Sequence, residues 1–439
     1  MNFNKVNNIT GWIVCIIACA VYILTAEAGG SLWDCGEFVS SCFKLQVPHP
    51  PGAPLFVVIG RIFIVLFGDN PLTAAKAVNI MSALASGFTI LFLFWTITHF
   101  TRKIYQKAHA ALSAEKVFTI MAAGVVGALA FTFSDSMWYS AVEGEVYAFS
   151  SFLTALVFWM MLKWEHNADE PGADRWIVLL FFVIGLSIGI HLLNLLTIPA
   201  IVMIYYFRRY KTTPWGIFWA FIVGCIITGF VQKFVIQYTI TGSGIFDRWF
   251  VNGLGLPFFS GFTAYFVLLG IVILIGIRKA DKLINNFTGF AVWLSVFIFL
   301  FSFPYITSFL SFLLFVAGTA IIVYAAYHSR LKILNFLKLG LWCFAFILIG
   351  YSTYLTTMIR SAANPSVDMY NVDNPMSLVG YVGREQYGDF PLIYGQTFAA
   401  DVKRNADGTP MIKEKGYRWQ KGDNKYINIG KNFEYEYED

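Results

Sequence analysis

The chain has 439 residues, of which 57% are hydrophobic, 18% aromatic and only 13% charged. Soluble domains carry about 25% charged residues, so this composition excludes an ordinary soluble protein. The formal net charge of +5 is small for so long a chain, and we expect no nucleic-acid partner.

The hydrophobic residues lie in runs that are long enough to cross a bilayer. Runs of about 18 or more apolar residues predict transmembrane helices, and backbone hydrogen bonding in lipid favours a helical bundle over a barrel. We therefore predict an all-α polytopic membrane protein with about eleven spans. Residues 54–67 are too short to span, and we expect them to form an interfacial helix on the outer face. The predicted spans are 9–27, 72–100, 115–134, 145–164, 174–190, 191–208, 214–236, 259–278, 287–303, 304–328 and 335–358.

Lysine and arginine residues collect in every second loop between the predicted spans. Cytoplasmic loops carry an excess of these residues, so the pattern predicts a cytoplasmic N-terminus and an external C-terminus. The first run, between Lys5 and Ala26-Glu27-Ala28, also resembles a signal peptide. Because it supplies the first span of this topology, we interpret it as a transmembrane helix. The basic loops contain Arg102, Lys103, Lys107, Lys163, Arg175, Arg208, Arg209, Lys211, Arg278, Lys279, Lys282, Arg330 and Lys332.

The polar tail is expected to form a second, smaller domain. We predict a transmembrane domain over 1–360 and a small extracytoplasmic β-rich tail over 361–439, which ends as a fragment of a longer protein would. In the tail, "NADGTP" and "KGDN" are turn signals beside strand-like runs such as "KYINI". They favour a small antiparallel β meander.

The predicted topology gathers acids on the outer face. "SLWDCGEF" carries Asp34 and Glu37 just after the first span, and Glu143 and Glu145 open the fourth. A carboxylate at such a boundary can act as a general base, bind a metal ion or cap a helix. Capping remains an alternative for Asp34, with Glu37 three residues later.

Cationic or potentially cationic side chains are predicted on the same face. His49 lies between prolines that fix its position, although a plain turn would also explain it. Arg61 could extend to the interface, and His191 could form an interhelical hydrogen bond. Arg360 ends the last span. A base that activates a hydroxyl, with cations that stabilise a departing phosphate, suits sugar transfer from a lipid-linked phosphate.

Five motifs are spread along the chain: "WDCGEF", "HPPGAPLF", "SAVEGEVYAFSSF", "GLSIGIHLLNLL" and "REQYGDFPLIYG". Together they resemble the GT-C glycosyltransferases. An acidic first outer loop, a proline step and a surface helix occur in this order in lipid A aminoarabinose transferases and protein O-mannosyltransferases. The chain most resembles glycosyltransferase family 117, which has Bacteroidota members and animal protein O-mannosyltransferases.

The resemblance implies a metal-independent, inverting transfer of mannose or a similar hexose from a polyprenyl phosphate to Ser/Thr hydroxyls. It implies Asp34 as base with Glu37 beside it, and His49 at the donor phosphate. It further implies a bacterial inner-membrane protein with a periplasmic site, and secreted or periplasmic protein acceptors. No cofactor is expected, although a divalent ion on the acids stays open. Further candidates for the phosphate are Arg61, His191 and Arg360; those for the sugar or acceptor are Trp33, Glu143, Glu145, Asn194 and Arg384.

Other functions remain possible on the sequence alone. The acceptor could be a lipid or a glycan. A lipid transporter would be expected to show internal repeats and ionisable residues near midplane, and we find neither. A structural subunit of an envelope machine would leave the cluster of acids and cations unexplained. Donor turnover by the purified protein separates an enzyme from both of these.

Overall fold

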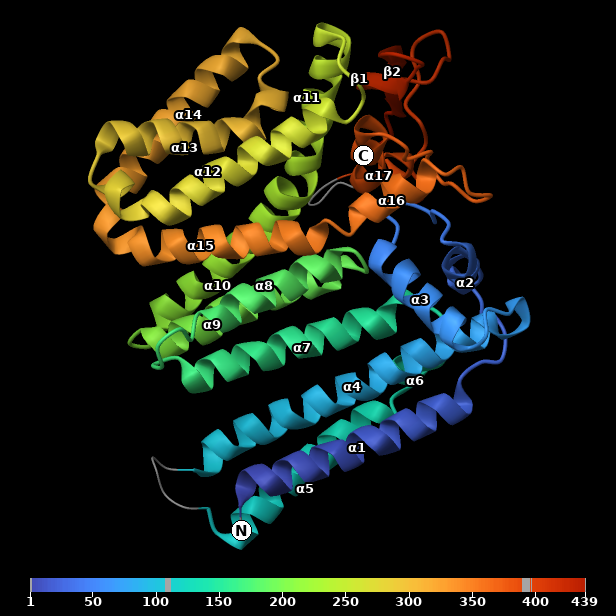
Figure 1. Cartoon of the computed structure of the whole chain (residues 1–439), viewed down its shortest axis with the longest axis vertical. Helices are drawn as coiled ribbons and strands as arrows, with labels where there is room; N and C mark the ends of the chain where they lie inside the picture. The colour runs from blue at the N-terminus through green and yellow to red at the C-terminus, as the bar shows by residue number, and fades with distance from the viewer. Residues whose placement is uncertain (1, 107–111, 389–394, 396, 439) are drawn as a thin grey trace. The chain divides into compact units, whose positions relative to one another are not determined.

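The computed structural model describes residues 2–106, 112–388, 395 and 397–438, which form two compact units (Figure 1). The first unit comprises Met1–Pro48, Ala53–Val235 and Leu334–Asp368. The second comprises His49–Gly52, Ile236–Ile333 and Met369–Asp439.

The first unit consists of helices. They are α1 (Phe3–Thr25), α2 (Cys35–Lys44), α3 (Pro54–Leu66), α4 (Pro71–Tyr105), α5 (Ala114–Thr132), α6 (Asp135–Val142), α7 (Val146–Asn167), α8 (Arg175–Ile188), the 3₁₀ helix η1 (Leu192–Thr197), α9 (Ile198–Arg209), α10 (Pro214–Phe230), α15 (Arg330–Tyr351) and α16 (Tyr354–Ser361).

Polar caps followed by proline begin several of these helices. The Asn70 side chain accepts a hydrogen bond from the Leu72 amide at 2.9 Å, and Pro71 is the first residue of α4. Thr213 and Pro214 begin α10 in the same way. A capping oxygen satisfies an amide that has no intrahelical partner, and proline at the first position costs no hydrogen bond.

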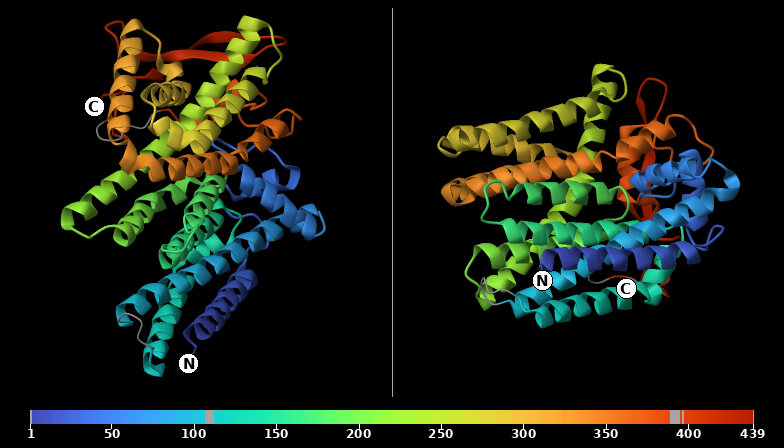
Figure 2. Two further views of the ribbon diagram at one scale, coloured as in Figure 1. Left: turned by 60° about the vertical axis from the view of Figure 1, so that its left-hand side comes forward. Right: turned by 60° about the horizontal axis from the view of Figure 1, so that its bottom comes forward.

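The core of the first unit forms where α1 packs beside α4 and α5, as Figure 2 also shows. Fully buried Tyr22 of α1 donates its hydroxyl proton to the Thr132 carbonyl oxygen of α5 at 2.9 Å. This bond satisfies the polar atom of an aromatic side chain whose ring fills the core.

Contacts at one end of the first unit confirm that its basic loops lie together. The Arg102 guanidinium stacks over the ring of Phe3, 4.6 Å from its centroid, so the end of α4 meets the start of α1. Lys103 pairs with Glu165 near the end of α7, and Arg208 of α9 pairs with Asp169. We call this the basic end of the unit.

Helices α8 and α15 approach each other at a pair of glycines. A Cβ atom at Gly185 would lie 2.4 Å from the Ile347 carbonyl oxygen, and one at Gly350 would lie 2.5 Å from the Phe182 carbonyl oxygen. Both neighbours are backbone atoms, so only glycine fits at either position. Small residues allow membrane helices to pack backbone against backbone.

The second unit contains the remaining helices and a hairpin. Strands β1 and β2 pair antiparallel, with Ile412 opposite Tyr435 and Lys421 opposite Tyr426. Its elements are α11 (Thr239–Leu254), α12 (Ser260–Ile284), α13 (Phe287–Ser302), the 3₁₀ helix η3 (Phe303–Tyr305), α14 (Phe309–His328), α17 (Pro375–Gly383), the 3₁₀ helix η4 (Glu385–Tyr387), β1 (Ile412–Lys421) and β2 (Tyr426–Tyr435).

A buried carboxylate attaches the hairpin to α11. Asp247 is fully buried and accepts a hydrogen bond from the Tyr426 hydroxyl at 2.7 Å. Its other oxygen accepts from the Gly261 amide at 3.0 Å. Burial, together with the Asp247 carboxylate, raises the pKa of Tyr426 far above its ordinary value. The hydroxyl therefore keeps its proton, and the bond persists, throughout the physiological pH range.

Replacing Tyr426 with Phe is expected to lower the free energy of unfolding by about 1–3 kcal/mol, because one buried carboxylate oxygen loses its donor. Equilibrium unfolding of the detergent-solubilised protein measures this loss. Tyr435→Phe is the matched control, since Tyr435 is half-exposed at the end of β2. Equal stabilities of the two variants would contradict the role of the Asp247 bond.

The polytopic helical fold is confirmed, with differences in detail. Ten helices in the described residues are long and apolar enough to cross a membrane. Region 174–190 instead contains α8, which has 14 residues and is shorter than a typical span. Residues 214–254 form one continuous helix with a π-helical stretch at Val231–Tyr238, whereas the predicted span ended at 236.

The two short elements predicted from the sequence are partly confirmed. Residues 54–67 do form a short helix, the 13-residue α3. The small β-containing tail is confirmed: it holds the antiparallel hairpin of β1 and β2, and isolated bridges join Val402 to Tyr437 and Arg404 to Pro410. The helix α17 precedes this hairpin and was not predicted.

Candidate functional site

The two acids of "WDCGEF" lie at the start of α2. Asp34 occupies the N-cap position and Glu37 the first turn, but the Asp34 side chain makes no capping hydrogen bond. The alternative in which Asp34 is only a cap is therefore not supported. Trp33, directly before it, has a φ of 60° and is 96% exposed. A bulky residue in this left-handed conformation is unusual and marks a constrained turn.

Two arginines hold the other end of α2. Arg61 donates to the Phe43 carbonyl oxygen at 2.8 Å and forms a two-pronged ion pair with Asp69, at 2.6 and 3.1 Å. This hydrogen-bonded pairing lowers the pKa of Asp69. Arg360 of α16 donates to the Leu45 carbonyl oxygen at 2.8 Å. Both side chains thus position the helix that carries the acids, and their contact with a phosphate stays a prediction.

The turn between α6 and α7 contacts α2. The Glu143 carboxylate lies close enough to Cys35 of α2 to help raise the pKa of its thiol, after the larger effect of burial. At the intervening Gly144, a Cβ atom would lie 3.1 Å from both the Asn79 side-chain oxygen and Val39. Glu145 is 6% exposed and accepts from the Val146 amide at 3.0 Å, so it caps α7. The structure therefore brings Asp34, Glu37, Glu143 and Glu145 to one end of the first unit, and we call them the acidic cluster.

His191 lies near the same end, beside the first turn of α7. Its ring is 5.3 Å from that of Tyr147, and its Nδ1 atom accepts from the Leu193 amide at 3.2 Å. Asn194 is fully buried, and its side-chain NH₂ group has no hydrogen-bond partner among the described residues. An unpaired buried donor is costly, so Asn194 remains a candidate for ligand binding.

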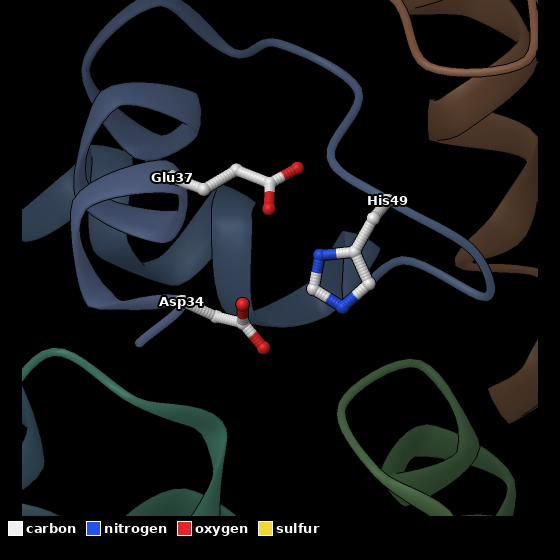
Figure 3. Close-up of side chains that lie close together, drawn as sticks. All are labelled: Asp34, Glu37 and His49. Atoms are coloured by element: carbon white, nitrogen blue, oxygen red, sulfur yellow. The ribbon is translucent and has the colours of Figure 1, made fainter. Parts of the chain in front are cut away.

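His49 completes a group with the two catalytic candidates. Figure 3 shows the side chains of Asp34, Glu37 and His49 turned toward one another, with one ligand atom of each within 4.8 Å of the others. Two carboxylates and an imidazole could hold a divalent cation. The same three groups can also perform acid–base chemistry without one.

Arg384 belongs to the second unit. It is the C-cap of α17, with a φ of 57°, and its guanidinium lies over the ring of Tyr387, 4.9 Å from the centroid. The neighbouring Glu385 lines a cavity of about 900 Å³ within this unit. The proposed contact of Arg384 with sugar or acceptor stays a prediction. The motif "REQYGDFPLIYG" that contains it continues into 389–394, outside the described residues.

Two residues that support the acidic cluster were not predicted. Asn79 of α4 is fully buried and donates to the carbonyl oxygens of Glu27 and Gly29, at 2.9 and 3.0 Å. Lys76 donates to the Ala26 carbonyl oxygen at 2.6 Å. They hold the loop that leads into α2. Their spacing of three, within an apolar run, places both on one helix face and could have indicated this role.

Cys35 reports on the integrity of the cluster. It is 1% exposed, and burial, with the charges of Glu143 and Glu145 beside it, raises its pKa from 9.0 to about 12. Because only the thiolate reacts, we expect alkylation at pH 8 to be at least about 10³-fold slower than for a Cys-containing peptide. Mass spectrometry over time measures this rate. Glu143→Gln should increase the alkylation rate only partly, since burial is the main cause of the raised pKa. A peptide-like rate in the native chain would contradict this packing.

Comparison with known proteins places a similarity in the first unit. Residues 34–214 match the model of a family described as the protein O-mannosyl-transferase TMEM260 N-terminal domain. The protein O-mannosyl-transferase tmem260 of Dictyostelium discoideum is 26% identical over 157 residues, 36% of this chain and 17% of that protein. The mouse protein O-mannosyl-transferase TMEM260 is 27% identical over 169 residues, 38% of this chain and 21% of that protein.

The chain therefore spans about a fifth of the length of these relatives. No solved structure matches it. The matched names agree with the resemblance to protein O-mannosyltransferases, while the narrower assignment to glycosyltransferase family 117 stays a prediction. The acidic cluster thus lies within a stretch that is similar to the N-terminal domain of this protein O-mannosyltransferase family.

Proposed function

We propose that this chain is a membrane glycosyltransferase that transfers a hexose, in the first instance mannose, from a polyprenyl phosphate to Ser or Thr hydroxyls of proteins. The observation that carries the proposal is the match of residues 34–214 to the O-mannosyltransferase domain. This stretch begins at Asp34 and includes every acid of the acidic cluster. The matching relatives support the same reaction class through their names.

The proposed reaction is a single displacement with inversion at the anomeric carbon. The Asp34 carboxylate takes the proton of the acceptor hydroxyl while the hydroxyl oxygen bonds to the sugar. The bond between the sugar and the phosphate oxygen breaks, and the electron pair leaves with the polyprenyl phosphate. Negative charge grows on that oxygen, and a cationic His49 would stabilise it. The non-capping Asp34 side chain and the grouping with His49 support these roles.

The test is transfer by the purified chain in lipid nanodiscs. With polyprenyl-phosphate mannose and a Ser/Thr-containing peptide, mass spectrometry should detect a peptide heavier by one hexose. The same donor without peptide, but with lipid or glycan acceptors, tests the alternative acceptors. We expect turnover to persist in EDTA, because the proposed base needs no metal. Complete loss in EDTA would assign Asp34, Glu37 and His49 to a metal site instead. No donor turnover with any acceptor would favour a transporter or a structural subunit.

We further propose that the protein lies in a bacterial inner membrane, with the basic end cytoplasmic and the acidic cluster periplasmic. The Lys/Arg bias of the loops supports this orientation. Leu32→Cys lies in the exposed loop before α2, and Lys116→Cys in the exposed first turn of α5. A membrane-impermeant maleimide applied to spheroplasts should label the first variant strongly and the second only after lysis. The reverse pattern would invert the topology, and the unmodified chain gives the background.

A further inference from the structure

A second cavity lies in the first unit, at its basic end. It measures about 440 Å³ and is formed by the start of α1 and the ends of α4 and α7. Trp95 and Trp159 stack with ring centroids 5.7 Å apart, and Trp12 meets Trp95 edge-on at 6.3 Å. We call it the tryptophan cavity, because all three rings line it.

The tryptophan cavity is far from the acidic cluster. Helix α4 connects the two, with Asn79 beside the cluster and Arg102 at the cavity. These residues are 23 positions apart, which corresponds to about 35 Å along an α-helix. The cavity is therefore separate from the proposed catalytic groups.

The ionisable side chains that line the cavity are all basic. They are His99, Arg102, Lys163 and His166, and no acid is among the described lining residues. The Glu165 carboxylate lies nearby and accepts a hydrogen bond from His99 Nε2 at 3.0 Å, so the charge of that histidine is partly compensated. Lys163 lies 4.9 Å from the Trp159 ring centroid, and Arg102 contacts Phe3 and Gln106. The potential in the cavity thus favours an anion over a cation or a neutral ligand.

Two buried polar atoms at the cavity lack partners. The Trp95 indole nitrogen and the Asn7 side-chain oxygen are both buried, without a hydrogen-bond partner among the described residues. An indole N–H can only donate, and leaving it unpaired costs about 1–3 kcal/mol. Both atoms are closed off from the cavity itself, and the indole nitrogen faces Gly11 of α1, where a Cβ atom would lie 2.8 Å from it. They belong to the packed cavity wall, so the basic side chains are the polar groups that a ligand would meet.

We propose that the tryptophan cavity binds the phosphate of an anionic phospholipid headgroup at the membrane surface. Phosphate oxygens suit the arginine–lysine pair, Arg102 and Lys163. Tryptophans gather where hydrocarbon meets water, and basic pockets between membrane helices bind anionic headgroups. The bound lipid would link α1, α4 and α7, at the end of the unit opposite the acidic cluster.

Native mass spectrometry of the full chain tests this binding. The probes are phosphatidylglycerol and phosphatidylcholine in equal amounts. We expect the native chain to retain phosphatidylglycerol preferentially, and Arg102→Gln/Lys163→Gln to lower its affinity on the order of 25-fold, about fivefold per lost charge. Lys116→Gln/Lys211→Gln is the matched control, because it removes the same charge from exposed positions outside the cavity.

A further variant and a competition with inorganic phosphate distinguish the possible outcomes. If the double variant does not fold, the single variant Lys163→Gln removes one charge at an exposed lining residue and should lower retention about fivefold. Displacement of the lipid by millimolar inorganic phosphate would assign the site to the phosphate group alone, whereas resistance to phosphate would assign it to the whole headgroup. Unchanged retention in the cavity variants, or an equal loss in the control, would overturn the proposal.

Discussion

Asp34→Asn is expected to lower the rate of transfer by about 10²–10⁴-fold, the usual contribution of a general base. The amide keeps the shape of the side chain but cannot take the acceptor proton. Since Asp34 makes no capping hydrogen bond, and Asn is as good a cap as Asp, α2 should remain folded. Initial rates of hexose transfer to the peptide, at saturating donor, measure the effect.

Matched variants distinguish a lost base from a damaged protein. Asp135→Asn makes the same change at an exposed position in the first turn of α6 and should leave transfer unchanged. Donor binding by Asp34→Asn should stay near that of the native chain. If Asp34→Asn is fully active and Glu37→Gln is not, the two roles are exchanged. If both variants are active, the proposed mechanism is wrong.

His49→Ala is expected to lower transfer on the order of 10²–10³-fold, as loss of one charge-stabilising group does. The effect should appear in the donor dependence, as a raised KM or a lowered kcat, while peptide binding stays the same. Transfer measured over a range of polyprenyl-phosphate sugar provides both constants. His328→Ala, at the end of α14, is the control. A normal donor curve would make His49 a turn residue and shift the phosphate role to Arg360.

The helical architecture could be predicted from the sequence because the surrounding bilayer largely determines it. A bilayer requires long apolar runs, and most of the predicted spans correspond to helices in the structure. The prediction of spans failed where a helix packs against other parts of the protein. Region 174–190 reads as a span, yet α8 has only 14 residues and packs through Gly185 against α15. Likewise, the predicted span 214–236 stops short of the observed helix, which continues to Leu254. This continuation carries buried Asp247, which accepts hydrogen bonds from the Gly261 amide and the Tyr426 hydroxyl within the second unit.

The candidate site was predictable in part. Charged residues beside apolar runs indicated Asp34, Glu37 and His49, and the structure brings them together. Arg61 and Arg360 donate hydrogen bonds to carbonyl oxygens at the C-terminal end of α2. These bonds could not be predicted, because they join residues up to 315 positions apart in the sequence. Lys76 and Asn79 were overlooked because an apolar run conceals polar residues whose partners are backbone atoms.

The glycine contact between α8 and α15 has a consequence for biosynthesis. Gly185 and Gly350 are 165 residues apart, and each faces backbone that a larger side chain would displace. At translation rates of about 5–20 residues per second, α8 leaves the ribosome roughly 10–30 s before its partner. During this interval the surface of α8 that carries Gly185 has no α15 to pack against. The first unit can therefore complete this contact only after α15 has been made, so α8 is synthesised long before the helix that it packs against.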